Sequence, residues 1–461
     1  MIIILPGAKP MIIKNGEELG LSPLRRLAID LIEAGIQSVQ PDRVIPSVLS
    51  FNPSSRTLDI PGHRFQIPCR LFIVGGGKAS GALAVSLEKI IAPDHICAGL
   101  VAGKGGNYQT RRVEVVNTGH PIPDERSVQA AERILGFKNM FDITGEDLVV
   151  CLISGGGSAL LSSPASGISL SDKQQAVDIL IKSGANITEI NVVRKHLSKI
   201  KGGNLGRHFS PAQVISLIIS DVSGNDPSVI ASGLTAADTS TFDDALGVIY
   251  RYKLAARLPP KVMNHLMKGR DGSVPDTPKS LPNCHNFTIA DNQLALTAMQ
   301  TRAKDLGRRV WISPSYISGE TASAACLAAA DIIGGKYNEF DTVIFGGETA
   351  PVVPSTAGAG GRNQHYALVA LQELRTMPGE WLVASVGTDG SDFIPDVAGA
   401  MADRATLEKA NRLGLNLTEF TDNFDSNSAF KSIGNSLVVT GDTGTNVGDF
   451  VLYLLENSTK V

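Results

Sequence analysis

A glycine-rich turn with one lysine follows the apolar run at residues 71–74 and could bind an anion. It reads VGGGKAS and contains Gly76, Gly77, Lys78 and Ser80. A strand that ends in such a turn before a helix directs backbone N–H groups and the positive end of a helix dipole toward one point, which suits a phosphate or a carboxylate. Lys78 adds a full positive charge. The spacing matches neither a P-loop nor a GxGxxG fingerprint, and a tight turn with a solvated lysine is the alternative.

A second turn of the same kind follows the next expected strand-helix unit. It lies in ISGGGSALL (residues 153–161), and its candidate anion-binding residues are Ser154, Gly155, Gly156, Gly157 and Ser158. Three glycines and two hydroxyl groups after an apolar strand can form an anion-binding nest. Because the carboxyl ends of parallel strands share one edge of a sheet, we expect the two turns to face a common crevice.

Two further segments of the first half carry charged candidates. Asp221 in SDVSGNDP follows the apolar run 214–219, where a carboxylate could bind a metal or accept a hydroxyl proton. A helix cap or turn cap is the alternative for this aspartate. Arg194 and Lys195 belong to NVVRKHLSKIKGG, which could supply cations to an anionic substrate or form a solvated helix face.

Glycine also joins polar residues in the second half of the chain. The segments are FGGET (345–349), GAGGRNQ (358–364), GTDGSD (387–392) and TGDTGTN (440–446). Their candidate ligand-binding residues are Gly347, Glu348, Arg362, Asn363 and Asp389. Arg362 offers the planar fork that recognises phosphate, whereas Glu348, Asp389 and Asp392 could hold Mg²⁺ beside a nucleotide. Glycine-rich polar loops in both halves suggest an anionic ligand bound between two domains.

The elements that must position these residues indicate an α/β fold. Short apolar runs alternate with segments of helical character, such as 124–138, 171–184 and 322–330. The expected strands lie near 71–74, 96–101, 113–116, 148–153, 214–219, 287–290, 309–312, 342–345, 381–386 and 436–439. Such continuous apolar strands are typical of parallel sheets covered on both faces. The pattern thus predicts two Rossmann-like domains with largely parallel sheets and a cleft between them.

The length of 461 residues exceeds what one hydrophobic core usually supports, so two domains are expected. Proline and glycine concentrate between residues 255 and 285, which places the boundary there. We expect an N-terminal domain over 1–265 and a C-terminal domain over 266–461. A first helix near 22–40, with Ser22 as N-cap and Pro23 in its first position, could pack on the other domain.

Composition narrows the class of partner. The net charge of −3 lacks the basic excess that nucleic-acid binding needs. The five cysteines are odd in number, widely spaced and without a CxxC pair, which argues against a disulfide framework and favours a reducing cytoplasm. The sequence shows neither a basic leader nor an apolar stretch long enough to span a membrane.

The motifs, in their order, resemble the class II glycerate kinases, also called glycerate 2-kinases, whose C-terminal half is the MOFRL domain. The resemblance covers residues from about 22 to 455. It rests on VGGGKAS, GHPIPDE (119–125), ISGGGSALL, NVVRKHLSKIKGG, SDVSGNDP with IASG (230–233), GGET, GAGGRNQ, GTDG and TGDTGTNV.

The resemblance implies two Rossmann-like domains with the active site in their cleft, and phosphoryl transfer from ATP, with a divalent cation such as Mg²⁺, to D-glycerate. The product in such enzymes is typically 2-phosphoglycerate. Lys78 and Arg362 fall on positions expected to bind anionic groups, and Asp221 on the acidic position of its motif. Candidate metal ligands are Asp221, Glu348 and Asp389. Asn225 stands where the family usually has aspartate, which argues against a metal ligand at that position.

Two other functions stay open. One is a reductase of hydroxypyruvate or tartronate semialdehyde, although no glycine fingerprint is followed by an acidic residue about twenty positions on. The other is a non-catalytic sugar-acid binding protein. The sequence also leaves open the 2- or 3-phosphate product and whether the chain forms a homo-oligomer.

Overall fold

The computed structural model describes residues 11–354 and 356–456, which divide by their contacts into two units. Unit 2 is Pro41–Ala290, and unit 1 comprises the described residues of Met1–Gln40 and Asp291–Val461. The chain changes unit at residue 290 rather than at the expected 265. The reason is that helix α11 (Pro260–Arg270) packs on other helices of unit 2 and strand β9 (Cys284–Ala290) completes its sheet.

The main sheet of unit 2 has six parallel strands in the order β6-β5-β4-β7-β8-β9. Its first five strands are β4 (Leu71–Gly76), β5 (Ile96–Gly103), β6 (Val113–Asn117), β7 (Leu148–Ser154) and β8 (Gln213–Ile219). Counted along the chain, this is the order 3-2-1-4-5-6 of Rossmann folds. The strand order reverses between β4 and β7, and the two glycine-rich turns follow these two strands. The predicted parallel sheet is therefore confirmed for this unit.

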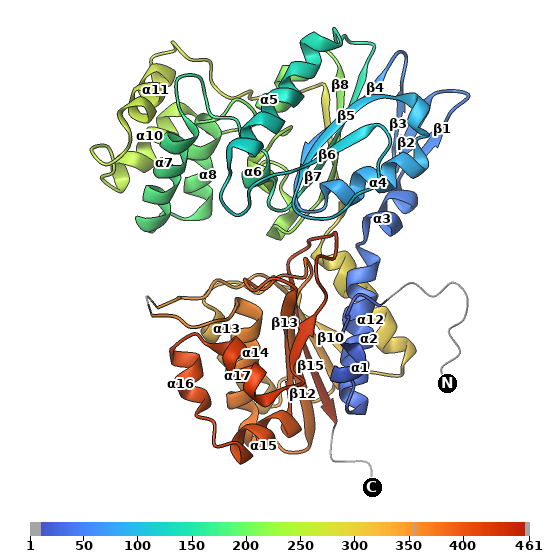
Figure 1. Cartoon of the computed structure of the whole chain (residues 1–461), viewed down its shortest axis with the longest axis vertical. Helices are drawn as coiled ribbons and strands as arrows, with labels where there is room; N and C mark the ends of the chain where they lie inside the picture. The colour runs from blue at the N-terminus through green and yellow to red at the C-terminus, as the bar shows by residue number, and fades with distance from the viewer. Residues whose placement is uncertain (1–10, 355, 457–461) are drawn as a thin grey trace. The chain divides into compact units, whose positions relative to one another are not determined.

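Helices cover the sheet of unit 2 and also form a separate cluster (Figure 1). Helix α4 (Ser80–Ile90) packs against β5 and β7, and α5 (Glu125–Met140) packs against β5 and α9 (Asn204–Phe209). The helical cluster has its own apolar core and contains α7 (Leu170–Lys182), α8 (Ile187–His196), α10 (Phe242–Arg251) and α11. Unit 2 further contains α3 (Pro41–Val48) and an antiparallel sheet of β1 (Ser50–Asn52), β2 (Thr57–Ile60) and β3 (His63–Gln66), which the sequence did not predict.

The sheet of unit 1 differs from the expectation in its strand directions. Its order is β10-β11-β15-β12-β13-β14, and within the described residues β10 and β11 are its one parallel pair. The strands are β10 (Val310–Ile312), β11 (Thr342–Gly347), β12 (Glu380–Gly387), β13 (Val397–Asp403), β14 (Leu437–Val439) and β15 (Asp449–Glu456). Strands β13 and β15 were not predicted, and their antiparallel pairing makes the sheet mixed. The fold class is α/β as predicted, but the largely parallel character holds for unit 2 alone.

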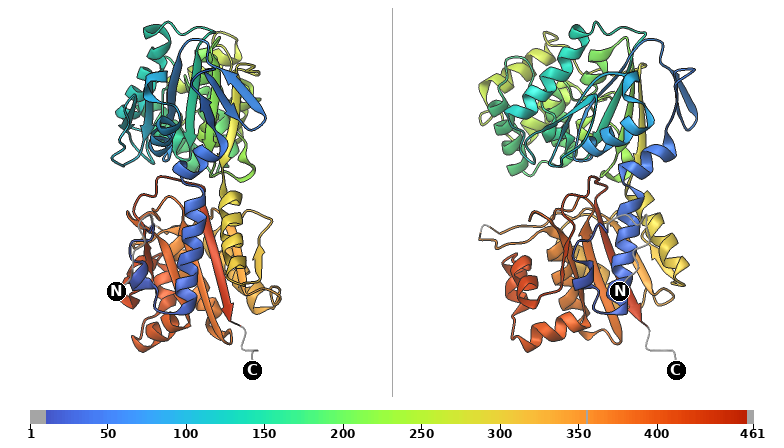
Figure 2. Two further views of the ribbon diagram at one scale, coloured as in Figure 1. Left: turned by 90° about the vertical axis from the view of Figure 1, so that its right-hand side faces the viewer. Right: turned by 45° about the vertical axis from the view of Figure 1, so that its right-hand side comes forward.

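Helices from both ends of the chain cover the sheet of unit 1. Helix α2 (Pro23–Ser38) contacts α12 (Asn292–Asp305), β12 and β15, so the first helix joins the unit built from the C-terminal half (Figure 2). Ser22 caps α2, since its Oγ accepts a 3.2 Å hydrogen bond from the N–H of Arg25. Unit 1 also contains α1 (Gly16–Leu19), α13 (Thr321–Ile333), α14 (Arg362–Glu373), α15 (Arg404–Arg412), α16 (Leu417–Asp422) and α17 (Ser426–Ile433).

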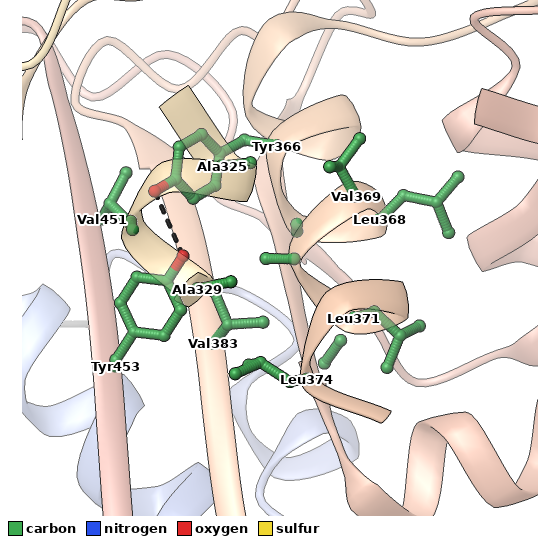
Figure 3. Close-up of a cluster of buried hydrophobic side chains, with 14 of the residues drawn as sticks. Ala325, Ala329, Tyr366, Leu368, Val369, Leu371, Leu374, Val383, Val451 and Tyr453 are labelled. Carbon is green, nitrogen blue, oxygen red and sulfur yellow. Dashed lines mark hydrogen bonds between the residues drawn. The ribbon is translucent and has the colours of Figure 1, made fainter. Parts of the chain in front are cut away.

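Helix α14 packs on the sheet, and most of its side chains are buried (Figure 3). Tyr366 of this helix and Tyr453 of β15 meet inside the apolar cluster, where their hydroxyl groups form a 3.1 Å hydrogen bond. This pairing satisfies two polar groups that would be costly to bury alone. The packing fixes the N-terminus of α14, where Arg362 lies, relative to the strands of unit 1.

Among the described residues, no helix combines the length and apolar character required to cross a membrane.

Candidate functional site

The turn after β4 rests on the turn after β7. The N–H groups of Gly77, Lys78 and Ala79 donate to the carbonyl of Ala102, the carbonyl of Gly155 and the Oγ of Ser154, at 3.0, 2.9 and 2.9 Å. A Cβ atom on Gly77 would lie 2.2 Å from this Oγ, and the φ of Gly77 is +153°, so only glycine fits. The expectation that this turn offers N–H groups to an anion is wrong for these three residues, because their N–H groups donate within the protein.

Two other candidates of the first turn are structural. The hydroxyl group of Ser80 is buried and donates to the carbonyl of Leu152 at 3.1 Å, which ties α4 to β7. Gly76 is the last residue of β4, and a Cβ atom there would lie 2.9 Å from the Cβ of Leu161. Both residues support the turn, whereas the half-buried side chain of Lys78 is the group of this turn that could meet a ligand.

The turn after β7 supplies the N–H groups that the first turn lacks. Gly156 has a φ of +77° and leads into the short helix α6 (Gly157–Leu160). The first hydrogen bond of this turn runs from the N–H of Ala159 to the carbonyl of Gly156 at 3.0 Å, and those of Leu160 and Leu161 follow. The N–H groups of Gly157 and Ser158 therefore precede the helical ladder. Such N–H groups are the usual donors to an anion.

Lys78 and His120 flank this turn. A Cβ atom on Gly156 would lie 3.0 Å from Nε2 of His120 and 3.1 Å from Cγ of Lys78. Glycine at position 156 thus lets two basic side chains approach the backbone of the turn. His120 follows β6 and was not among the predicted site residues, although it stands in the GHPIPDE motif. Its proximity to a glycine-rich turn could not be read from spacing along the chain.

Ser158 and Arg194, two of the predicted substrate-binding residues, belong to one hydrogen-bond network that also contains Ser232 and Asn191, which were not predicted. The Oγ of Ser158 lies 2.9 Å from the Oγ of Ser232, which donates to Oδ1 of Asn191 at 3.1 Å. Arg194 donates to Ser158 Oγ and Asn191 Oδ1 at 3.4 and 3.2 Å. Ser232 has a φ of +59°, a strained value for serine that this network holds in place.

Asp221 lies at the same edge of the sheet as the two turns. In the parallel register of β7 and β8, Ser154 pairs with Ile219, and Asp221 follows two residues later. Its side chain is partly exposed. The structure therefore brings Lys78, the Gly156–Ser158 turn and Asp221 to the carboxyl ends of β4, β7 and β8, where open parallel sheets bind ligands.

Lys195 does not join this group as an available cation. Its Nζ forms a buried ion pair with Asp238 at 3.1 Å. Burial raises the pKa of the Asp238 carboxyl, but the charge of Lys195 and hydrogen bonds from Ser240 outweigh it and lower the pKa overall. The expectation that Lys195 binds substrate is corrected to a structural ion pair, since i and i+1 positions of a helix face different directions.

In unit 1, two carboxylates engage the guanidinium group of Arg362. Its Nε and Nη2 donate to Asp449 at 2.6 and 3.0 Å, and its Nη1 lies 2.7 Å from Oε1 of Glu348. Burial lowers the pKa of Arg362, but the charge of Asp449 more than reverses this and keeps the group protonated. The planar side of the guanidinium group that was predicted to bind phosphate thus binds Asp449 instead. Asp449 is the first residue of β15, a strand that was not predicted from the sequence.

Asp392 caps α14 beside this arginine. Its carboxylate accepts hydrogen bonds from the backbone N–H groups of Asn363 and Gln364 at 3.0 and 2.8 Å. Burial raises its pKa to about 6. Asn363 is itself buried and accepts a 2.6 Å hydrogen bond from Ser385, so it fixes the helix rather than facing a ligand.

The remaining candidates of unit 1 lie at strand ends. Gly347 ends β11 next to Glu348, and a Cβ atom on Gly347 would lie 2.1 Å from the carbonyl of Ile317. Asp389 follows β12 and accepts a 3.0 Å hydrogen bond from the N–H of Ser391. Within residues 11–354 and 356–456, no three His, Cys, Asp or Glu side chains are grouped so as to hold a metal ion. One or two carboxylates together with phosphate oxygens are nevertheless the usual ligands of Mg²⁺ in nucleotide sites.

Two domain families match this chain, and several known proteins are similar to it over most of its length. Residues 27–267 match a domain of unknown function, DUF4147, and residues 341–449 match the MOFRL family. A protein of Pyrococcus horikoshii named glycerate 2-kinase is 35% identical over 438 residues, which are 94% of this chain and 97% of that protein. A protein of Agrobacterium vitis named putative hydroxypyruvate reductase is 38% identical over 84% of this chain and 99% of its own.

A solved structure of a glycerate kinase from Thermotoga maritima is similar with a TM-score of 0.79. It is 33% identical and covers 94% of this chain and 99% of its own. Identity above 30% over nearly the full length of both chains, together with the two matched domains, shows that the chain belongs to the glycerate kinase family.

Proposed function

We propose that this protein transfers the γ-phosphoryl group of ATP to D-glycerate and that the product is 2-phosphoglycerate. The observation that carries the proposal is the full-length similarity to proteins named glycerate 2-kinase, from Pyrococcus horikoshii and Thermotoga maritima. The geometry of unit 2 supports it, because Lys78, Arg194 and the Gly156–Ser158 turn offer positive charge and N–H groups at one sheet edge. Phosphoryl transfer asks a protein chiefly for such positioning and charge stabilisation.

Four residues of unit 2, Lys78, Gly157, Ser158 and Asp221, have the following roles in this proposal. Lys78 neutralises anionic oxygens of the substrate, and the N–H groups of Gly157 and Ser158 donate to them. Asp221 orients or deprotonates the attacking hydroxyl group, which its position beyond β8 and its partial exposure allow. Mg²⁺, when bound, would offset charge on the phosphate oxygens, with Asp221, Glu348 and Asp389 as its candidate ligands.

For Arg362 we propose a role that differs from the expected one. Because Asp449 occupies its fork and Glu348 its third nitrogen, we propose that Arg362 positions these two carboxylates rather than clamping a phosphate. An arginine held by two carboxylates carries little net charge with which to attract an anion. The proposed location of the active site in a cleft between two domains stays a prediction, as do the cytoplasmic location and a homo-oligomer.

A reductase is the second candidate, since a relative from Agrobacterium vitis carries the name putative hydroxypyruvate reductase. The hydrogen bonds of the first turn argue against a nicotinamide dinucleotide there. A Rossmann site offers the N–H groups of this turn to the pyrophosphate, whereas here Gly77, Lys78 and Ala79 donate within the protein. This difference favours the kinase.

One assay with two arms separates these functions. Purified protein is incubated with D-glycerate, ATP and Mg²⁺, and phosphorus NMR compares the product with authentic 2- and 3-phosphoglycerate. The same preparation is given hydroxypyruvate and NADH while absorbance at the NADH band is followed. Formation of 2-phosphoglycerate supports the proposal, and 3-phosphoglycerate would correct the product. NADH oxidation without ATP consumption would establish the reductase, and thermal stabilisation by glycerate with neither reaction would indicate a binding protein.

A further inference from the structure

Three basic side chains of unit 2 donate hydrogen bonds to the Gly156–Ser158 turn or to the segment that follows it. Nζ of Lys173 donates to Oγ of Ser162, and Nζ of Lys201 donates to the carbonyl of Leu161, each at 3.4 Å. Arg194 donates to Ser158 at the same distance. Lys173 is 4% exposed and Lys201 is 0% exposed, although lysine is rarely buried without a partner.

Among the residues that the structure describes, no carboxylate pairs with any of these three side chains. In the described part of the chain, no ion pair includes Lys173, Arg194 or Lys201. The charged groups that act on the two lysines are cations, namely Arg194 on Lys173 and both of these on Lys201. By contrast, Lys195 of the same region has the carboxylate of Asp238 as its partner. Burying a charge without a partner costs several kcal/mol, so the arrangement calls for a negative charge from elsewhere.

A buried hydroxyl group in the same segment also lacks a partner. The Oγ of Ser163 is inaccessible and has no hydrogen-bond partner among the described residues. It adjoins Ser162, which receives the hydrogen bond of Lys173. Polar atoms buried without partners are rare in folded proteins and often mark a place where a ligand or ordered water completes the network.

We propose that Lys173, Arg194 and Lys201 form a buried cationic cluster that binds the carboxylate or phosphate oxygens of a substrate at the Gly156–Ser158 turn. Arg194 is half-buried and contacts the anion, whereas the two buried lysines act through the charge that they gain when the anion binds. A charge buried in a medium of low dielectric constant acts on a neighbouring ion more strongly than an exposed one. The cluster deepens the proposed function, on which it rests for the identity of the substrate.

Anion binding at this cluster has a measurable consequence for protons. Burial, assisted by the charge of Arg194, lowers the pKa of Lys173 to about 7, and burial with the charges of Lys173 and Arg194 lowers the pKa of Lys201 well below its usual range. At pH 8 Lys173 is therefore largely neutral in the unliganded protein. A bound anion favours the charged forms of both lysines and raises both pKa values, so binding takes up protons.

Calorimetry of the full chain tests this coupling. D-glycerate, ADP and inorganic phosphate are titrated separately into the protein at pH 8 in two buffers of different ionisation enthalpy. We expect proton uptake with at least one of these anions, and comparison of the three identifies the carboxylate or the phosphate as the group bound. Absence of proton uptake on binding of every anion overturns the proposal, and this result requires no variant.

Variants assign the uptake to the cluster. Lys173→Met and Lys201→Met should each weaken anion binding by about tenfold or more and reduce the proton uptake. Because an apolar side chain replaces a buried amino group that has no carboxylate partner, the unliganded variants should melt at or above the temperature of the wild type. Lys199→Met is the matched control, since Lys199 lies in the same stretch but is exposed.

Unchanged affinity and proton uptake in both variants would overturn the proposal, as would a lower melting temperature with unchanged affinity. The test is also separable from the proposed function. If the wild type fails to phosphorylate glycerate but phosphate binding still takes up protons that Lys201→Met abolishes, the kinase assignment fails and the anion site stands.

Discussion

The side-chain oxygen of Ser154 accepts a 2.9 Å hydrogen bond from the backbone N–H of Ala79, which joins the turns after β4 and β7 into one support. Gly77 lies between them with no room for a side chain. Because these strands flank the point where the strand order of unit 2 reverses, a change at this contact affects both turns.

Replacing Gly77 by alanine should destabilise the protein by about 2 kcal/mol or more, since its Cβ atom would overlap Ser154 in a backbone conformation unsuited to alanine. Urea unfolding measures this loss. Gly136→Ala is the control. Gly136 lies in helix α5, and a Cβ atom added there would have no neighbouring atom within 4 Å, so alanine should stabilise the protein slightly. Equal effects of the two substitutions would contradict the packing argument.

Removing the charge of Lys78 should abolish most ATP-dependent phosphorylation of glycerate while leaving the fold intact. Lys78→Ala should lower kcat/KM by about 100-fold or more, because one positioned donor to developing negative charge contributes that much. Steady-state kinetics with circular dichroism checks both expectations. The exposed Lys104 provides a control variant, Lys104→Ala, and retention of full turnover by Lys78→Ala would remove this role.

The pair of Arg362 and Asp449 should behave as one unit in a double-mutant cycle. Arg362→Lys loses the bidentate geometry, and Asp449→Asn removes the charge that holds the guanidinium group. We expect a coupling energy of about 1.5–3 kcal/mol in urea unfolding. Additive effects would show that the contact contributes little, and would return Arg362 to the phosphate-binding role.

The ion pair of Lys195 and Asp238 should matter for stability rather than for substrate affinity. Asp238→Asn leaves a buried positive charge without its partner and should cost about 3–5 kcal/mol. The double variant Lys195→Met with Asp238→Leu should recover most of this loss. Thermal unfolding measures the effect, and a KM for glycerate that rises in the recovered double variant would restore Lys195 to the site.

The buried carboxyl group of Asp392 should make stability depend on pH. Burial raises its pKa from 3.8 in the unfolded chain to about 6, so the folded state binds more protons between these values. Its contribution to the free energy of unfolding is therefore fully present below pH 4 and declines as the pH rises to about 6.

Other carboxyl groups, such as that of Asp403, have lowered pKa values and change the stability with pH in the opposite direction. The difference in free energy of unfolding between the wild type and Asp392→Asn separates the contribution of Asp392 from theirs. Urea unfolding at pH 4, 5, 6 and 7 should show the wild type losing stability relative to the variant between pH 4 and pH 6, with little further change at pH 7. A difference that does not change with pH would contradict the assignment.

Much of unit 2 was predictable from sequence because its strands are continuous apolar runs. The register that places Ser154 near Asp221 follows from parallel strands that end in polar residues. Ser232 and His120 were missed because they reach the turns from distant loops, and the strained backbone at Ser232 depends on tertiary contacts. Lys195 was expected to bind substrate because of its charge alone. Its ion-pair partner Asp238 lies 43 residues away in the sequence, so the pair could not be predicted from local spacing.

Unit 1 was predicted less well. Strand β15 is an apolar run near the end of the chain, but its antiparallel insertion between β11 and β12 is a long-range pairing that periodicity does not reveal. Missing this strand also hid Asp449, and with it the reason that the fork of Arg362 is occupied. The role of an arginine depends on its nearest carboxylates, which only the fold brings together.

The placement of helix α2 makes the two halves of the chain unequal as independent fragments. Residues 41–290 are one continuous segment, so a gene for this segment alone encodes every element of unit 2. A fragment starting at residue 291 would lack Arg25, whose guanidinium group forms a buried ion pair with Asp403 at 2.6 Å. A fragment that contains all of unit 1 must therefore include residues 1–40 of the chain as well as residues 291–461. A circular permutant that links the C-terminus to the original N-terminus would join these two segments. In the order of the chain, unit 2 is an insertion into unit 1.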